Sequence, residues 1–228
     1  MNILCIDTST EYLSIGILFR GQVLSTVDIH AKLRTSDIII PTIHKLLKKY
    51  KLKLVDFDAF SVGLGPGSFT GLRIATATIK ALSFCMNKKI IGICSLDLIA
   101  YNVREDGNIC VIIDAKRNLL YSGFYKKKNG LITRQWFIKL LSVDSVLNIC
   151  RDKIFCAPTY FLGNGLGIYR DKIRNSLKNS IILDEAFWYP RAKNLCLAAK
   201  QMYRDKKFIS IDKLKPLYIY PKHCQVRK

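Results

Sequence analysis

Two short sequence features occur twice in this chain, in the same order, and this repetition limits the folds it can adopt. Ile6-Asp7 is followed by a glycine nine residues after the aspartate, and Ile113-Asp114 is followed by one at the same distance. Leu64-Gly65-Pro66-Gly67 then has a counterpart in Leu162-Gly163-Asn164-Gly165. A repeat of this length indicates two related structural units.

Hydrophobic patterning predicts a similar succession of elements in the two halves. Continuous or alternating apolar runs predict strands, and apolar residues at helical spacing predict helices. The turn-forming residues 105–108 then separate two expected domains, residues 1–105 and 106–228. The expected strands are 2–7, 13–20, 23–28, 57–62, 89–94, 109–114, 120–126 and 136–141, and the expected helices are 36–50, 68–86, 95–103 and 143–150.

This pattern resembles the actin, Hsp70 and sugar-kinase-like (ASKHA) fold. We expect an α/β protein of duplicated actin-like lobes, each a mixed five-stranded-type sheet with helices. The resemblance implies ATP binding between the lobes, with aspartates at the ends of the first strands. The candidate cleft, which we regard as vestigial, consists of Asp7, Thr8, Ser9, Asp114, Gly163 and Gly165. Alternatively, each aspartate caps a turn by accepting backbone hydrogen bonds.

The glycine-rich run from Leu64 to Arg73 connects an expected strand to an expected helix. Gly65 and Gly67 can adopt positive φ, Pro66 restricts its own φ, and Ser68 is suited to cap the helix. A helix start of this kind can hold phosphate. However, the spacing is neither that of a dinucleotide-binding loop nor that of a Walker loop, which ends in Gly-Lys-Ser/Thr. The motif therefore favours a turn over a phosphate cradle.

Charge is distributed unevenly in this chain of 228 residues. The formal net charge is +20, of which residues 1–105 carry +5 and residues 106–228 carry +15. A basic second half is typical of nucleic-acid binding, but lysine-rich codon usage explains it equally well. The basic residues we consider for tRNA contact are Lys126, Lys127, Lys128, Arg170, Lys172, Arg174, Lys206 and Lys207.

Composition argues against several other function classes. The eight cysteines form no CxxC pair, and the three histidines form no HxxxH or HExxH motif, so we expect no metal site and no metallopeptidase activity. The N-terminus lacks the features of a signal peptide, and no apolar run approaches the roughly 20 residues of a membrane span. We expect reduced thiols and a cytoplasmic protein.

The helix after the glycine-rich turn carries a stripe of small residues at Gly71, Ala75 and Thr78. Such a stripe lets another element approach closely. It either packs on the chain's own sheet or receives a helix of a partner, and periodicity alone does not separate these alternatives. Leu72, Ile79 and Leu82 lie beside the stripe.

Motifs along nearly the whole chain are similar to those of the TsaB (YeaZ) family. They are Ile3 to Thr8, Leu64 to Arg73, Val111 to Arg117 with Tyr121, Gly163-Asn164-Gly165, Tyr189-Pro190-Arg191-Ala192 and Leu214-Lys215-Pro216-Leu217-Tyr218. One departure is Thr35-Ser36, where the family commonly has His-Ser. The role assigned to that histidine therefore does not transfer to this chain.

The resemblance implies a non-catalytic scaffold that pairs with the paralogue TsaD. With TsaE, the pair supports formation of N6-threonylcarbamoyladenosine beside the anticodon of tRNAs reading ANN codons. No intrinsic cofactor is expected, although ATP or ADP at the junction with partner proteins is compatible with the family, and the chain alone is expected to form a homodimer. The implied interface comprises Ser36, Ile40, Ile43, Leu47, Gly65, Pro66, Gly67, Ser68, Phe69, Thr70, Gly71, Leu72, Arg73, Ala75, Thr78, Ile79 and Leu82.

Two alternatives to a scaffold stay open at the level of sequence. One is an autonomous ATP-binding or ATP-hydrolysing enzyme of the same fold that uses Asp7 and Asp114. The other is a tRNA-binding module based on the basic second half. We expect no catalytic residue in the chain if the scaffold hypothesis holds.

Overall fold

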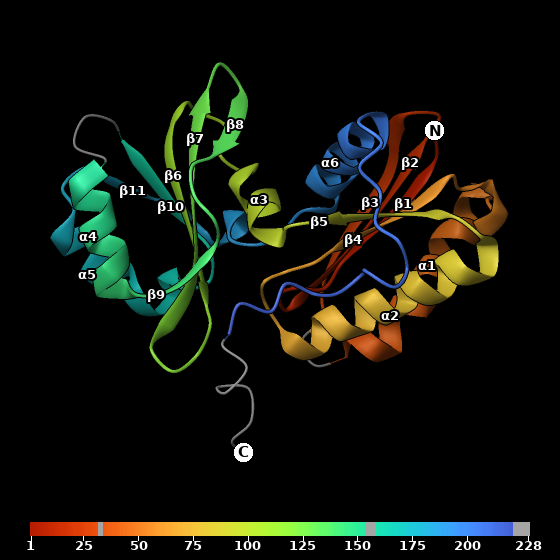
Figure 1. The fold of residues 1–228 in the computed structure, drawn as a ribbon, viewed down its shortest axis with the longest axis horizontal. Coiled ribbons are helices and arrows are strands. Elements are labelled where there is room, and N and C mark those ends of the chain that lie inside the picture. Colours follow the sequence, from red (N-terminus) through yellow and green to blue (C-terminus); the bar gives the residue numbers. More distant parts are fainter. Residues whose placement is uncertain (32–33, 154–157, 221–228) are drawn as a thin grey trace. The chain divides into compact units, whose positions relative to one another are not determined.

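The computed structural model describes residues 1–31, 34–153 and 158–220, which form two compact units (Figure 1). Among the described residues, the first unit contains Met1–Leu98 and Pro190–Leu217, and the second contains Ile99–Tyr189 and residues 218–220. This division differs from the expected one at residue 105. The chain leaves the first unit at Leu98 and returns to it at Pro190, a long-range return that local sequence patterns do not reveal.

The first unit is built on a five-stranded mixed sheet with the order β3-β2-β1-β4-β5. Strand β1 pairs with β2 antiparallel and with β4 in parallel, and β4 pairs with β5 in parallel. All five residues of β1 and of β4 are buried, as expected for strands covered on both faces. The strands are β1 (Ile3–Asp7), β2 (Tyr12–Phe19), β3 (Gln22–His30), β4 (Ala59–Gly63) and β5 (Lys89–Ile93).

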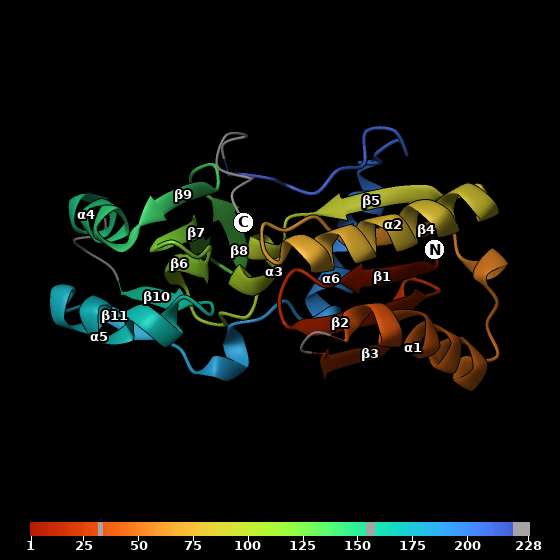
Figure 2. The same cartoon turned by 90° about the horizontal axis from the view of Figure 1, so that it is seen from below.

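Helices cover the two faces of this sheet from different parts of the chain (Figures 1 and 2). On one face, α1 (Thr35–Tyr50) and α2 (Phe69–Met86) contribute residues such as Ile43 and Ile79 to a cluster with Leu4 and Ile6 of β1. On the other face, α6 (Ala192–Arg204) packs Cys196 and neighbouring residues against Ile3 and Cys5. A short 3-10 helix, η1 (Leu54–Asp56), precedes β4.

The second unit repeats the strand connectivity of the first. Its six-stranded sheet has the order β11-β10-β6-β7-β8, and β9 pairs with β7. Strand β6 pairs antiparallel with β7, as β1 does with β2, and in parallel with β10, as β1 does with β4. The strand β10 is the fifth of its unit, because β8 and β9 both pair with β7. The strands are β6 (Gly107–Asp114), β7 (Leu119–Lys128), β8 (Leu131–Arg134), β9 (Lys139–Ser142), β10 (Thr159–Leu162) and β11 (Ser180–Ile182).

The helices of the second unit are α4 (Val143–Lys153) and α5 (Leu166–Ser176), and η2 (Glu185–Phe187) is a 3-10 turn. Val146 and Leu147 of α4 and Leu166 of α5 are buried. Helix α3 (Ser95–Ala100) spans the change from the first unit to the second. None of the helices in the described part of the chain is long and apolar enough to cross a membrane.

The expected α/β class and the two mixed sheets are confirmed, and most expected elements lie within a few residues of the observed ones. The strand expected at 136–141 is wrong in its first half, because β9 begins at Lys139. The helix expected at 95–103 ends at Ala100. Cys156, His223 and Cys224, which entered the arguments about metals and thiols, lie outside the described residues.

Candidate functional site

The carboxylate of Asp7 is buried at the end of β1 and is bound by hydroxyl and amide groups of its own unit. Its Oδ1 accepts hydrogen bonds from the Ser9 amide at 2.8 Å and the Ser9 hydroxyl at 2.7 Å. Its Oδ2 accepts one from the Ser95 hydroxyl at 2.6 Å. Burial raises the pKa of Asp7, whereas the hydrogen bonds from Ser95 and Ser9 oppose this rise, and Asp28 adds to it.

The glycine-rich turn after β4 packs directly on the turn between β1 and β2. A Cβ atom on Gly67 would overlap the Ser9 carbonyl, and a Cβ on Gly71 would overlap the Thr8 carbonyl. The Ser68 amide donates to the Ser9 carbonyl at 2.7 Å, and the Thr8 hydroxyl donates to the Gly71 carbonyl at 2.7 Å. These glycines are therefore required for the close approach of two backbone segments within one unit.

Ser68 caps α2 as expected, whereas Ser95 has a different role. The Ser68 hydroxyl accepts a hydrogen bond from the Gly71 amide at 3.2 Å. The Ser95 hydroxyl, besides donating to Asp7, accepts the Gly65 amide at 3.0 Å. Ser95 thus joins the strand-end carboxylate to the glycine-rich turn.

The corresponding turn of the second unit is closed in a similar way. The Asp114 amide donates to the Asn164 side chain at 2.9 Å, and the Gly165 amide donates to the Ile112 carbonyl at 3.1 Å. A Cβ on Gly163, whose φ is +109°, would overlap that same carbonyl. The Asp114 carboxylate accepts the Lys116 amide at 2.8 Å and pairs with its ammonium at 2.6 Å.

The groups assigned to a nucleotide cleft are thus engaged within the fold. Thr8 and Ser9 are fully buried, and their hydroxyls donate to protein oxygens rather than facing a ligand. Both aspartates accept hydrogen bonds from the backbone two residues further on, which is the geometry of a turn cap. This arrangement does not fit phosphate binding by these side chains.

The residues expected at a partner interface divide into an outer and an inner set. The glycine and alanine of the small-residue stripe belong to the inner set, because they pack on the unit's own sheet and turn. The exposed members are Ser36, Ile40, Ser68, Phe69, Thr70 and Arg73. The partly exposed members are Leu47, Gly67, Thr78 and Leu82, and the buried ones are Ile43, Gly65, Pro66, Gly71, Leu72, Ala75 and Ile79.

The exposed face of α2 contains residues that the sequence argument missed. Starting at Phe69 and Arg73, helical spacing leads to Ala77 and Ala81, and Phe84 lies near the end of the helix, all of them exposed. Phe69 is 54% exposed, Phe84 is 77% exposed, and the Arg73 guanidinium lies 5.2 Å from the centre of the Phe69 ring. The spacing of four residues places Arg73, Ala77 and Ala81 on one side of the helix, but it does not show that this side is the exposed one.

The basic residues considered for RNA contact do not form one set. Lys206 and Lys207 belong to the first unit, whereas the others belong to the second. Several are engaged by neighbours: Lys127 donates to the carbonyls of Val103 and Arg104, Lys172 pairs with Asp144, and Arg170 lies over the Trp188 ring.

The thiols and histidines of the described residues do not gather into a ligand set. Within the ranges that the structure covers, no three His, Cys, Asp or Glu side chains lie close enough to hold a metal ion. Burial raises the pKa of the Cys5 and Cys110 thiols. Cys85, on the outer face of α2, is exposed.

Comparisons with known proteins identify relatives along nearly the whole chain. Residues 29–225 match the family model described as TsaD, tRNA N6-adenosine threonylcarbamoyltransferase. The tRNA threonylcarbamoyladenosine biosynthesis protein TsaB of Bacillus subtilis is 30% identical over 203 residues, which cover 88% of each chain. That of Escherichia coli is 26% identical over 223 residues, which cover 96% of this chain and 94% of the relative.

Solved structures support the fold. YeaZ from Pseudomonas aeruginosa superposes with a TM-score of 0.81 at 23% identity, covering 95% of this chain and 99% of that one. A second P. aeruginosa structure, described as similar to the peptidase YeaZ, has a TM-score of 0.83 at 23% identity and covers 96% and 99%. The duplicated α/β architecture expected from the repeats is confirmed by the matching strand pairings of the two sheets. The chain belongs to the TsaB (YeaZ) family and is involved in the threonylcarbamoyladenosine modification of tRNA.

Proposed function

We propose that this chain is a non-catalytic partner of the threonylcarbamoyltransferase TsaD and pairs with it through the outer face of α2 and adjacent residues of α1. With TsaE, the pair would support threonylcarbamoyl transfer to tRNA. The observation that carries the proposal is the exposed row on α2 from Phe69 to Phe84, with Ala77 and Ala81 between the two aromatic residues.

This row has the shape that helix packing requires. Two large apolar side chains stand near the ends of an 18-residue helix, and small side chains lie between them, so a partner helix can approach closely in the middle. Ile40 on α1, 54% exposed, adds a further apolar side chain on the neighbouring helix. Exposed apolar side chains grouped in this way are typical of protein–protein interfaces, which bury about 1,600 Å² when stable.

The hydrogen bonds and the ion pair that the two strand-end aspartates make within the protein also support a role as a binding partner rather than as an autonomous enzyme. Asp7 is surrounded by Ser9 and Ser95, and the Asp114 carboxylate is bound by Lys116. A phosphoryl-transfer site needs carboxylates that can reach a metal ion and phosphates. In this chain the two carboxylates instead accept hydrogen bonds from the backbone of the turns that follow them.

The test is pairing with TsaD from the same organism, measured by sedimentation or by co-purification. Ala77→Trp and Ala81→Trp place bulk on the outer face without entering the chain's own core, and each should weaken pairing by at least about tenfold. Gln201→Trp, on an exposed position of α6, is the matched control and should pair normally. The same two variants should lower threonylcarbamoyladenosine formation in a reconstituted reaction with TsaD and TsaE.

We also propose that the same face forms a homodimer when TsaD is absent. The chain alone should then sediment as a dimer, and Ala77→Trp should shift it to a monomer. Folded Ala77→Trp and Ala81→Trp proteins that still bind TsaD with unchanged affinity would exclude this face as the pairing surface.

A further inference from the structure

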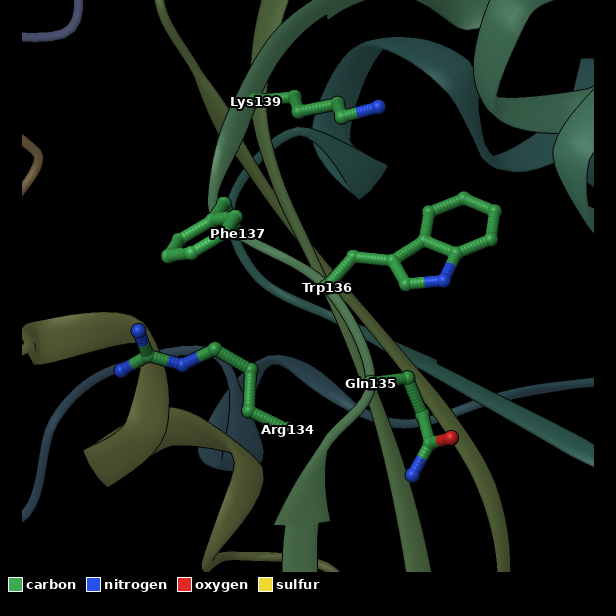
Figure 3. A pocket seen from close by; sticks show the side chains of 5 residues that line it. All are labelled: Arg134, Gln135, Trp136, Phe137 and Lys139. Carbon is green, nitrogen blue, oxygen red and sulfur yellow. The ribbon is translucent and has the colours of Figure 1, made fainter.

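The connection between β8 and β9 presents two aromatic rings beside basic side chains (Figure 3). It lines a surface hollow of about 560 Å³. Phe137 is 86% exposed, an unusual state for a phenylalanine in a short connection between strands. The lining residues are Arg134, Gln135, Trp136, Phe137 and Lys139.

This connection is held in place by the sheet beneath it. The Gln135 amide donates to the Phe124 carbonyl of β7 at 2.8 Å, and the Trp136 ring lies 5.3 Å from the Phe124 ring. The Lys139 ammonium lies 5.4 Å from the centre of the Trp136 ring. Because Trp136 packs on the sheet, the adjacent Phe137 is presented outward on an ordered support. Figure 3 shows the Phe137 and Trp136 side chains pointing to opposite sides of the connection.

The chain segment that forms the hollow carries basic side chains and no acidic ones. Residues 119–142, which include β7, β8 and β9, contain five lysines and arginines and no aspartate or glutamate. Lys126 and Lys128 of β7 are exposed, as are Arg134 and Lys139 at the hollow. A surface of this kind attracts polyanions.

We propose that this surface, the β8–β9 connection with Arg134 and Lys139, binds single-stranded RNA. An unpaired base stacks on the exposed ring of Phe137, and the cationic side chains neutralise the adjoining phosphates. Aromatic platforms flanked by basic residues bind single strands in this way, because every base offers a face for stacking. The occupant follows from charge complementarity: five positive charges without a negative one suit a phosphate backbone and disfavour an apolar or basic protein surface.

The proposal goes beyond the pairing with TsaD and does not depend on it. The α2 face belongs to the first unit, whereas residues 119–142 belong to the second. A family that acts on tRNA has single-stranded loops of RNA in its substrate. The two proposals therefore have separate variants and separate measurements.

The test measures binding of the full-length chain to a short, unstructured, fluorescently labelled RNA by fluorescence anisotropy over a series of salt concentrations. Phe137→Ala should weaken binding by about tenfold and leave the salt dependence unchanged, because stacking carries no charge. Lys139→Gln should instead reduce the slope of log K against log salt by about 0.7, the value for one phosphate contact on a single strand.

Two matched control variants distinguish RNA binding at this site from nonspecific binding of RNA to other apolar or basic side chains. Leu131→Ala removes another exposed apolar side chain, on β8, and Lys193→Gln removes an exposed lysine from the first unit. Both variants should bind RNA like the parent. The same sequence in duplex form should bind more weakly than the single strand.

Three results would overturn the proposal. They are no binding by the parent chain at low salt, a folded Phe137→Ala variant with the affinity of the parent, and equal losses in Phe137→Ala and Leu131→Ala. Loss of TsaD pairing in the Ala77→Trp variant with retained RNA binding would support the separation of the two surfaces.

Discussion

The hydroxyl of Ser95 donates a 2.6 Å hydrogen bond to Oδ2 of Asp7, linking residues 88 positions apart in the sequence. The same hydroxyl accepts the Gly65 amide. One side chain at the start of α3 therefore orders both the end of β1 and the glycine-rich turn. In Ser95→Ala, a buried carboxylate oxygen and a buried amide lose their partner, so we expect a loss of about 1–3 kcal/mol in the free energy of unfolding, measured by urea denaturation.

The raised pKa of Asp7 predicts a pH dependence that a single substitution removes. Between the ordinary carboxyl pKa and the raised folded value, the folded chain retains a proton that the unfolded chain has released. Rising pH therefore lowers the stability of the parent relative to Asp7→Asn across this window, by at most about 1.4 kcal/mol per pH unit, and the difference is constant above it. Denaturant titrations of both proteins from acid to neutral pH measure the effect. Parallel stability curves across that range would contradict the raised pKa.

Gly71 and Gly167, each in the first turn of its helix, should respond in opposite ways to alanine. A Cβ on Gly71 would overlap the Thr8 carbonyl, so Gly71→Ala requires a shift of backbone and should cost about 1–3 kcal/mol. A Cβ on Gly167 would meet Trp188 at an ordinary contact distance of 3.9 Å, so Gly167→Ala should stabilise the chain by about 0.5–1 kcal/mol. Thermal unfolding of both variants provides the measurement, and a neutral Gly71→Ala would contradict the packing described for the turn.

Ala75 and Ala77 distinguish the inner face of α2 from its outer face. Ala75 is fully buried, so Ala75→Leu overfills the core and should cost about 1–3 kcal/mol of stability. Ala77 is exposed, so Ala77→Leu should change stability by less than about 0.5 kcal/mol. Loss of TsaD binding by Ala75→Leu would then indicate damage to the fold, so pairing is tested at the exposed positions Ala77 and Ala81 instead. Equal stability losses at both positions would contradict the assignment of the two faces.

Cys85 offers a direct probe of the α2 face. It is exposed, whereas Cys5 and Cys196 are buried. A thiol-alkylating reagent should modify Cys85 in the chain alone and leave the two buried thiols unmodified, as measured by mass spectrometry of peptides. Addition of TsaD should slow the modification of Cys85 at least several-fold. An unchanged rate in a sample where pairing is confirmed would place the interface elsewhere.

The two repeated motifs predicted the fold because their order along the chain indicates how the strands are connected, and not only where single strands or helices lie. An aspartate ends both β1 and β6, and the glycine turns follow β4 and β10, which are the strands that pair in parallel with β1 and β6. The strand expected from residue 136 begins only at Lys139, and Trp136 lies in the preceding connection with its ring on Phe124. The run Trp136-Phe137-Ile138 is continuously apolar, and such a run does not show where a connection ends and a strand begins.

The face of α2 could not be assigned from periodicity. Gly71 and Ala75 form a regular stripe of small residues, and such a stripe fits a partner helix or the chain's own sheet equally well. What decides between them is the Thr8 carbonyl, which occupies the position that a side chain at residue 71 would need. That contact joins segments 63 residues apart, and no local pattern records it.

The return of α6 to the first unit has a consequence for the order in which a ribosome can build this protein. One face of the first sheet is covered by α1 and α2, which are synthesised early, but the other face receives Leu195, Cys196 and Ala199 only after the whole of the second sheet has been translated. At about 5–20 residues per second, the nascent chain spends several seconds with that apolar face uncovered.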